Sequence, residues 1–232
     1  MGFTWKANNC NMPEFAVIFD MDGVIVDSEK VYQEIERQMY DDLEIPVSKE
    51  EHRLFIGAAE RSMWQYMKDK YQMDTEIDFL VNEERTRFMS QLDQPGNISL
   101  MPGLLELLEA LAQEGIQALV ASSSSREIIE KVLRVNDIRH YFKDITGGDD
   151  VLHSKPAPDI FLESASKADT VPGQCLVIED SENGIRAALS AGMKVVALLN
   201  NYSDGLDLSA ASKTIHALHE LDTDVIRQVL NY

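Results

Sequence analysis

Two aspartates lie two residues apart, directly after an apolar run near the start of the chain. The run FAVIF at 15–19 leads into Asp20 and Asp22, and Gly23 follows. Like charges at this separation repel each other, and the repulsion is poorly screened beside an apolar core. We therefore expect that the pair either faces solvent as a polar turn or has a positive group between its carboxylates.

A hydroxyl, an ammonium group and two further carboxylates occur later in the chain, where predicted strands end or a predicted helix begins. Ligands in open α/β sheets lie beyond the carboxyl ends of the strands, so we expect these side chains to meet the aspartate pair there. The lysine that carries the ammonium group is predicted to lie at the start of a helix. The residues of this set are Ser122 in ASSSSRE, Lys155 in HSKPAPDIF, and Glu179 and Asp180 directly after the apolar run at 176–178.

This set of side chains fits phosphoryl transfer that depends on a metal ion. The four carboxylates supply hard oxygen ligands of the kind that Mg²⁺ prefers. Ser122 and the backbone N–H groups after it can hold phosphate oxygens at the start of a helix near Arg126, and Lys155 can neutralise a phosphate and an aspartate. One aspartate can then attack phosphorus, while a second carboxyl group protonates the leaving oxygen and later activates water.

The elements that must position these residues follow from the hydrophobic pattern. Short continuous apolar runs alternate with segments in which apolar residues recur at helical spacing. Strands without polar alternation are buried on both faces, which indicates a parallel sheet covered by helices. The fold class is therefore predicted as α/β with a doubly wound parallel sheet. The predicted strands are 15–19, 118–121, 176–178 and 195–199, and the predicted helices include 103–113, a segment around 128–133 and one from 183 to Gly192.

One region interrupts this alternation between the first and second predicted strands. From 28 to 95 there is no convincing strand, and apolar residues such as Val31, Ile35 and Met39 recur at helical spacing. We expect a small α-helical cap domain here, inserted so that it lies over the aspartate pair. The predicted domains are a core formed by 13–27 and 96–232, the cap at 28–95, and an N-terminal extension at 1–12.

Composition and charge restrict the class of partner. The chain has 232 residues, of which 44% are hydrophobic and 26% charged, as in ordinary soluble globular proteins. Its 21 Lys and Arg against 40 Asp and Glu give a formal charge of -19, which argues against nucleic acid and anionic membrane surfaces as partners. With only Cys10 and Cys175, and with no signal peptide or transmembrane run, we expect a cytoplasmic protein. The oligomeric state is left open, and a monomer is compatible with the sequence.

Four motifs occur along the chain in a recognisable order. They are D-x-D-G at 20–23, the serine after the second strand at Ser122, K-P-x-P at 155–158 and E-D-S-x-x-G-I at 179–185. Together they resemble the motifs of the haloacid dehalogenase (HAD) superfamily, from about Phe15 to Asn200. The form DGVIVDSE and the helical insertion look like the β-phosphoglucomutase-like branch of that superfamily. The resemblance implies a Rossmann-like catalytic core, a small helical cap, a Mg²⁺ cofactor and phosphoryl transfer.

The resemblance also implies a role for each residue of the set. Asp20 is then the nucleophile and Asp22 the general acid and base. Ser122 and the backbone at Ser123 bind the phosphate, and Lys155 bridges the phosphate and the nucleophile. The implied metal ligands are Asp20, the main-chain carbonyl of Asp22, Asp180, and Glu179 directly or through water. The implied enzyme is a phosphatase that hydrolyses a small phosphorylated metabolite of the sugar-phosphate type through an aspartyl phosphate.

A hexose phosphate mutase of the β-phosphoglucomutase type is the main alternative. Three departures from the mutase pattern favour the phosphatase. Tyr32 stands where the mutase has a histidine, and Ser125 stands where it has a lysine. A cap arginine is not clearly matched, since Gly57 is followed by AAE and Arg61 comes one place late. More remote alternatives are a phospho-accepting signalling module and a non-catalytic protein that binds a phosphorylated ligand.

Other conspicuous residues are expected to be structural. Ser124 and Ser125 fit a polar loop, and Glu179 could also be an acid that caps a helix. Asp149 and Asp150 are expected to make loop contacts only. The core of the cap is expected to contain Trp64, Tyr66 and the methionines at helical spacing, and no histidine is assigned a role in the site.

Overall fold

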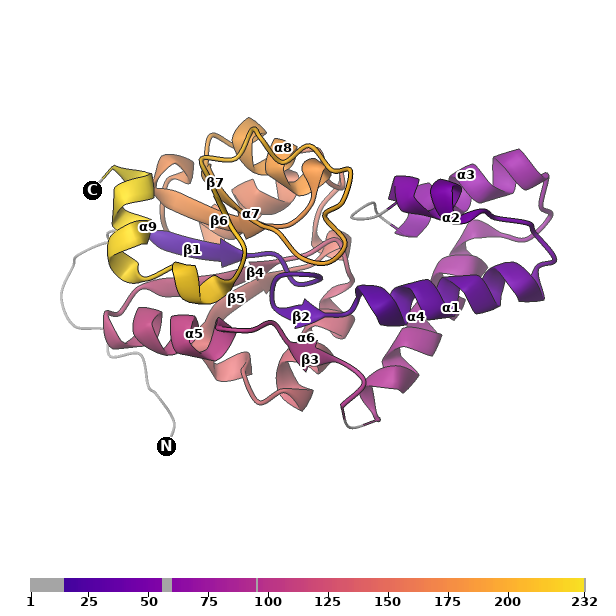
Figure 1. The fold of residues 1–232 in the computed structure, drawn as a ribbon, viewed down its shortest axis with the longest axis horizontal. Helices are drawn as coiled ribbons and strands as arrows, with labels where there is room; N and C mark the ends of the chain where they lie inside the picture. Colours follow the sequence, from indigo (N-terminus) through magenta and orange to yellow (C-terminus); the bar gives the residue numbers. More distant parts are fainter. Residues whose placement is uncertain (1–14, 56–59, 95, 232) are drawn as a thin grey trace.

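The computed structural model describes residues 15–55, 60–94 and 96–231. A sheet with covering helices forms most of it, and a group of four helices lies at one end (Figure 1). The predicted N-terminal extension at 1–12 lies outside the described residues, as do Cys10 and Gly57. None of the helices in the described ranges combines the length and the hydrophobicity that a membrane span requires.

The central sheet has six strands, all paired in parallel, in the order β5-β4-β1-β6-β7-β8. This is the predicted doubly wound arrangement, with the first strand in the middle. The apolar runs predict four of these strands. They miss β5, whose sequence FKDIT interrupts its apolar residues with charged ones, and β8, which has only 3 residues. The strands are β1 Ala16–Phe19, β4 Gln117–Ala121, β5 Phe142–Thr146, β6 Cys175–Glu179, β7 Lys194–Leu198 and β8 Lys213–Ile215.

Helices cover both faces of the sheet. Helices α5, α6 and α9 share one apolar core with Val17 and Phe19 of β1, and helices α7 and α8 share another with Ala16 and Ile18. Because successive side chains of a strand point to opposite faces, the four residues of β1 alternate between the two cores. The bounds are α5 Leu104–Gln113, α6 Arg126–Val135, α7 Asp159–Lys167, α8 Glu182–Ser190 and α9 Thr223–Leu230. Short 3-10 helices are η2 Arg139–Tyr141, η3 Gly148–Asp150, η4 Pro172–Gln174 and η5 Leu218–Glu220.

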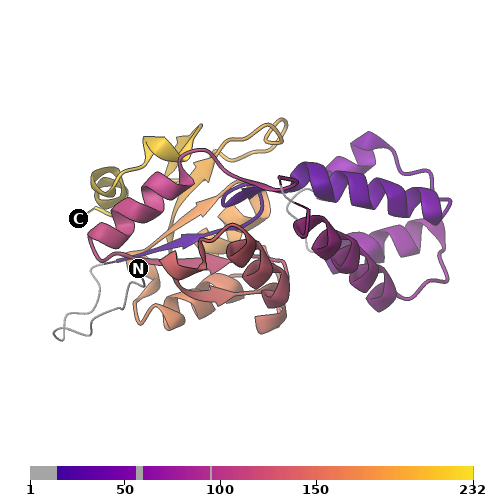
Figure 2. The same ribbon diagram turned by 90° about the horizontal axis from the view of Figure 1, so that it is seen from below.

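Four helices follow the first strand and lie together beyond its carboxyl end (Figures 1 and 2). The short antiparallel strands β2 and β3 join them to the sheet part of the chain. Between 28 and 94 the described residues contain helices but no strand, as the periodicity predicts. The division into a cap and a core domain stays a prediction. The bounds are β2 Val26–Asp27, α1 Glu29–Asp42, α2 Lys49–His52, the 3-10 helix η1 Arg53–Phe55, α3 Glu60–Tyr71, α4 Ile77–Leu92 and β3 Ser99–Leu100.

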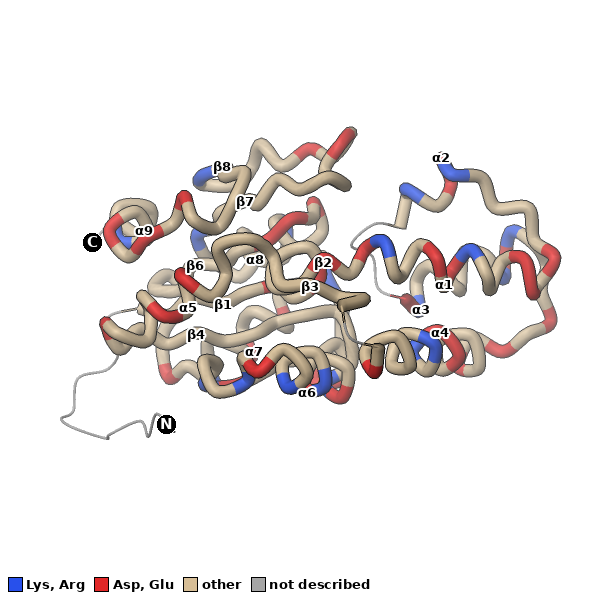
Figure 3. The backbone as a smooth tube through the Cα atoms, turned by 60° about the horizontal axis from the view of Figure 1, so that its bottom comes forward, with Lys and Arg blue, Asp and Glu red and all other residues tan. Residues whose placement is uncertain are grey.

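An apolar core holds these four helices together and to the rest of the molecule. Trp64 and Phe88 are fully buried in it, and the same core continues to Ile25 and the sheet. The prediction that Trp64 and the methionines of α3 belong to this core is confirmed, whereas Tyr66 is 39% exposed. Along α1 and α4, acidic and basic residues are intermixed (Figure 3). This pattern is typical of helices with one solvated face.

Candidate active site

The sheet brings three of the predicted residues together at one edge. Strand β1 lies between β4 and β6, with Phe19 opposite Val120 on one side and Ile178 on the other. Asp20 directly follows β1, Ser122 directly follows β4, and Glu179 is the last residue of β6. Since parallel strands end on the same side of a sheet, these side chains meet there, as the motif positions predict.

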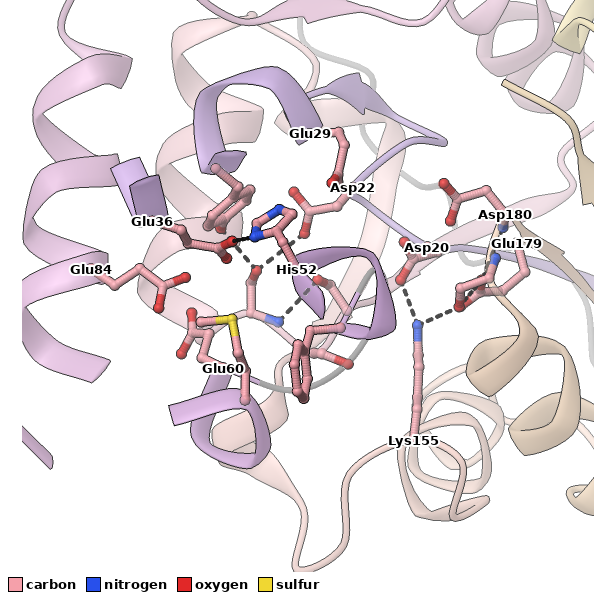
Figure 4. A pocket seen from close by; sticks show the side chains of 17 residues that line it. Asp20, Asp22, Glu29, Glu36, His52, Glu60, Glu84, Lys155, Glu179 and Asp180 are labelled. Carbon is pink, nitrogen blue, oxygen red and sulfur yellow. Dashed lines mark hydrogen bonds and ion pairs between the residues drawn. The ribbon is translucent and has the colours of Figure 1, made fainter. Parts of the chain in front are cut away.

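Lys155 lies between the carboxylates at this edge (Figure 4). Its Nζ atom donates to Asp20 Oδ1 at 2.5 Å and to Glu179 Oε1 at 2.7 Å. A third, longer hydrogen bond of 3.3 Å goes to the carbonyl oxygen of Ala121. The expectation that Lys155 begins a helix is wrong, because α7 begins only at Asp159. The proline after Lys155 disfavours helical backbone at this position.

Burial dominates the electrostatics of this cluster. It lowers the pKa of Lys155, but the neighbouring charges of Asp20 and Glu179 outweigh this effect and raise the pKa overall. Burial also raises the pKa of Asp20 to about 8, since Glu179 and Asp22 add to the effect and Lys155 offsets it only in part. One ammonium group therefore does not balance the carboxylates that surround it.

Asp22 occupies a different environment from Asp20, and its carboxylate points into the pocket rather than toward Lys155 (Figure 4). Its Oδ1 accepts a hydrogen bond from Ser28 Oγ at 2.5 Å, and its Oδ2 accepts one from Ser124 Oγ at 3.2 Å. Burial raises the pKa of Asp22, and these hydroxyl groups offset the rise in part. A carboxyl group with a raised pKa keeps its proton to higher pH than an ordinary aspartate, which suits a general acid.

The serine run after β4 lines the same pocket. Ser122 is buried, and its Oγ accepts the backbone N–H of Ser124 at 3.1 Å. Ser123 also lines the pocket. The expectation that Ser124 is only a polar loop residue is wrong, because it is buried and binds Asp22. Ser125 is also buried, at the N-cap of α6.

Three carboxylates at the strand ends could hold a metal ion. Oxygen atoms of Asp20, Glu179 and Asp180 lie within 4.8 Å of one another. Burial raises the pKa of Asp180 well above its ordinary value, and Asn200 Nδ2 donates to its Oδ2 at 2.7 Å. Three hard carboxylate oxygens, two of them from buried residues, beside one ammonium group fit a divalent cation such as Mg²⁺, which would restore the charge balance. The side chain of Asp22 is not a member of this group among the described residues.

Glu179 also has a structural part in this arrangement. While Oε1 accepts from Lys155, Oε2 accepts the backbone N–H groups of Asp180 and Ser181, each at 2.9 Å. Gly184 in the first turn of α8 leaves room for this carboxylate, because a Cβ atom there would overlap it. Gly23 likewise has a positive φ of 76° and lies where a Cβ atom would overlap the carboxylate of Asp180. The glycines of both motifs are therefore required by close packing.

Several residues of the pocket have no counterpart in the sequence predictions. The pocket has a cavity of about 100 Å³ and extends from the strand ends to the four helices. At the end of the pocket farther from the strands, each of the four helices contributes a polar side chain. Two of these side chains are close together, since His52 Nδ1 lies 3.1 Å from Glu36 Oε2. In the sequence each of these residues looks like an ordinary solvated helix residue, and only tertiary packing brings them together. The residues are Glu36 of α1, His52 of α2, Glu60 of α3 and Glu84 of α4 (Figure 4).

Asp149 and Asp150 contact helices as well as a loop. Asp149 Oδ1 accepts the backbone N–H of Arg126, the first residue of α6, at 2.8 Å, and Asp150 Oδ2 accepts that of Gly147 at 3.1 Å and lies 3.3 Å from Lys167 Nζ of α7, so the expectation of loop contacts only is wrong. Tyr32 lines the pocket, where its ring stacks on Phe88 with a centroid distance of 4.2 Å.

Comparisons with known proteins agree with this geometry. Residues 17–198 match the family model of haloacid dehalogenase-like hydrolases. A phosphorylated carbohydrates phosphatase of Thermotoga maritima is 32% identical over 220 residues, which cover 93% of this chain and 99% of the relative. The structure of CbbY from Rhodobacter sphaeroides in complex with xylulose-(1,5)bisphosphate superposes with a TM-score of 0.81 at 25% identity, covering 90% of this chain and 96% of the other. The structure of β-phosphoglucomutase from Clostridium difficile has the same TM-score and identity, and covers 93% of this chain and 96% of the other.

Proposed function

Since the chain belongs to the haloacid dehalogenase-like hydrolase family, we propose that it is a Mg²⁺-dependent phosphatase for a small phosphomonoester of the sugar-phosphate type. The supporting observation is the contrast between its two neighbouring aspartates. Asp20 is held by the Lys155 ammonium group, whereas Asp22 is held by hydroxyl groups in the pocket. Two carboxyl groups in such different environments suit the roles of nucleophile and acid.

In the first step a carboxylate oxygen of Asp20 attacks phosphorus and forms an aspartyl phosphate. The bond from phosphorus to the leaving oxygen breaks, and Asp22 gives its proton to that oxygen, so that an alcohol leaves. Lys155 neutralises charge on the phosphoryl oxygens and on Asp20. Ser122 and the backbone at Ser123 bind phosphoryl oxygens at the start of α6.

In the second step Asp22, now ionised, takes a proton from a water molecule as that molecule's oxygen attacks phosphorus. The bond between phosphorus and Asp20 breaks, which releases phosphate and regenerates the carboxylate. We assign the binding of Mg²⁺ to Asp20, Glu179, Asp180 and the main-chain carbonyl of Asp22. When bound, the ion supplies positive charge that neutralises phosphate oxygens and favours the ionised form of the surrounding carboxylates.

A helical cap and a small substrate complete the proposed site. Residues 28–95 act as a helical cap over the site, and the substrate is a small metabolite of the cytoplasm rather than a nucleic acid or a membrane lipid. The net charge of -19 supports this choice of partner. The phosphatase is favoured over the mutase because Tyr32 and Ser125 replace the histidine and lysine of the mutase pattern.

Phosphate release from a panel of sugar phosphates and small phosphoesters, with and without Mg²⁺, tests the proposal. We expect release that requires Mg²⁺ and that disappears in the variant Asp20→Asn, which preserves the size of the side chain. A matched control is Asp41→Asn, which removes a carboxylate from α1 outside this pocket. Normal release by Asp20→Asn would overturn the assignment of the nucleophile, and no release from any substrate would overturn the phosphatase.

A further inference from the structure

The end of the pocket that the four helices line contains three glutamates among apolar and neutral polar side chains. We define the acidic wall as Glu36, Glu60 and Glu84, which line the pocket from three different helices (Figure 4). Lys155 is the only lysine or arginine among the described residues that line this pocket, and it lies at the opposite end, beside Asp20. Among the described residues, the pocket therefore has its one ammonium group where a phosphate would bind and no lysine or arginine side chain at its far end.

The protein's own donors near the wall are already engaged. Trp64 Nε1 donates to Glu84 Oε2, and Arg85 Nε donates to Glu60 Oε2 at 2.7 Å. His52 lies beside Glu36 and is also within 3.3 Å of the Tyr40 hydroxyl group. These contacts hold the carboxyl groups in place but leave no free cation at the wall among the described residues.

Acceptor capacity remains at the wall. Glu60 Oε1 is buried and has no hydrogen-bond partner among the described residues. Glu36 and Glu84 lie within hydrogen-bonding range of each other, and Glu84 is only 1% exposed. Two carboxyl groups so close must share a proton or receive donors from another molecule. Glu60 is also close enough to Asp22 for their charges to interact, so the wall and the reacting groups face one space.

We propose that the acidic wall selects the organic part of the substrate, by accepting hydrogen bonds from its hydroxyl or ammonium groups and by rejecting a second phosphate or a carboxylate. This inference rests on the proposed phosphatase function and narrows its substrate class to monophosphates of polyols, sugars or amino sugars. Hydroxyl and ammonium groups share the required chemistry, since both donate hydrogen bonds to carboxylates. Above the raised pKa of Glu84, about 8, a second anionic group would meet like charge in a poorly screened cavity, where such contacts cost several kcal/mol.

A matched set of hexose derivatives tests the wall. The probes are glucose 6-phosphate, glucosamine 6-phosphate, 6-phosphogluconate and glucose 1,6-bisphosphate, compared by kcat/KM for phosphate release in the presence of Mg²⁺ at a pH above about 8, where Glu84 is ionised. We expect the first two to be hydrolysed at least about tenfold more efficiently than the last two. A higher kcat/KM for glucose 6-phosphate than for glucosamine 6-phosphate would indicate recognition of a hydroxyl group, and the reverse would indicate recognition of an ammonium group.

The variants Glu60→Gln and Glu84→Gln remove charge from the wall while keeping the size of the side chain. For each variant we expect the ratio of kcat/KM for the first two probes to kcat/KM for the two more anionic probes to fall by about tenfold. The control is Glu83→Gln, which removes a neighbouring charge on α4 that pairs with Arg87 at 2.8 Å and does not line the pocket. It should leave the ratio unchanged. Equal efficiency for all four probes, or unchanged ratios in both wall variants, would overturn the inference.

Binding of the same four ligands to Asp20→Asn, measured by calorimetry, separates this inference from the proposed function. If none of the probes releases phosphate but the two anionic ones bind at least about tenfold more weakly, the phosphatase is wrong and the wall is right. If phosphate is released but all four ligands bind equally, the wall is wrong and the phosphatase is right.

Discussion

At Asp20 and Asp22 the chain gives two identical side chains different partners and therefore different properties. The ammonium group of Lys155 faces the first, and the hydroxyl groups of Ser28 and Ser124 face the second. The two carboxylates can therefore lie close together beside an apolar core, because each has hydrogen-bond donors of its own. These donors come from different segments of the chain. The properties of Asp20 and Asp22 therefore depend on the folded structure and not on the two residues alone.

Lys155 is the residue whose loss should affect stability most. In Lys155→Met the carboxylates of Asp20 and Glu179 would stay buried without their cation, so we expect the free energy of unfolding to fall by about 3–5 kcal/mol. Denaturant unfolding at neutral pH measures this change.

The control for that experiment is Lys143→Met. Lys143 Nζ lies 3.0 Å from Asp169 Oδ2, whose side chain is 79% exposed, so the pair is a surface one. We expect a change within about 1 kcal/mol. An equally small change in Lys155→Met would contradict the view that its charge balances the buried carboxylates.

Glu84 makes stability depend on pH. Burial raises its pKa to about 8 from 4.5. Between these values the folded chain keeps a proton that the unfolded chain has released, so the free energy of unfolding falls as pH rises. We expect Glu84→Gln to be more stable than the parent by about 4 kcal/mol near pH 8 and nearly equal to it near pH 4. Chemical unfolding at both pH values measures this, and an advantage that does not grow with pH would refute the assignment.

Among elements, the start of α8 shows how a helix can position a reacting group that lies on another element. Gly184 leaves space for the Glu179 carboxylate, which in turn holds Lys155. In Gly184→Ala we expect displacement of Glu179, a loss of about 2 kcal/mol in unfolding free energy, and slower phosphate release. Gly173→Ala is the matched control, because a Cβ atom there meets nothing within 4 Å. Thermal unfolding and turnover that stay normal in Gly184→Ala would contradict this account.

The hydrophobic pattern predicts elements well where each element is long or continuously apolar. It finds β1 and α5, and the motifs at the strand ends then place Asp20, Ser122 and Glu179 together. It misses β5 and β8, since a mixed or very short strand at or near the edge of a sheet carries little hydrophobic signal. The pattern predicts that Lys155 begins a helix, although the proline that follows it disfavours helical backbone, and Lys155 lies in a turn before α7.

Residues without a local signal could not be predicted at all. The acidic wall draws one glutamate from each of three helices, and each of them has the spacing of an ordinary solvated position. Ser124 within a run of serines gave no indication of its contact with Asp22. Such groups become recognisable only when packing sets which face of a helix or loop meets the pocket.

On the scale of the whole molecule, the site lies where the sheet part and the four helices meet, and one apolar core runs through both. Metal binding to the strand ends should therefore stabilise the entire fold. At about 100 times the Kd, free Mg²⁺ should add about 2.7 kcal/mol to the free energy of unfolding. Thermal unfolding with Mg²⁺ and with a chelator measures this gain.

Asp180→Asn provides the control for metal binding. The variant removes one of the three carboxylates at the strand ends while leaving a side chain of equal size. We expect most of the stabilisation by Mg²⁺ to disappear in it. Equal stabilisation of both proteins would mean that the ion binds elsewhere.

The central claim is that Asp20 carries the phosphoryl group between the two steps. The most direct measurement uses Asp22→Asn, which lacks the base for the second step, with an aryl phosphate whose leaving group needs no acid. The reaction is quenched in acid during the first turnover, and the peptides are analysed by mass spectrometry. We predict a phosphoryl group on the peptide that contains Asp20, and on Asp20 itself. Phosphate on another residue such as Ser122, or release of phosphate with no modified peptide at any time, would contradict the account.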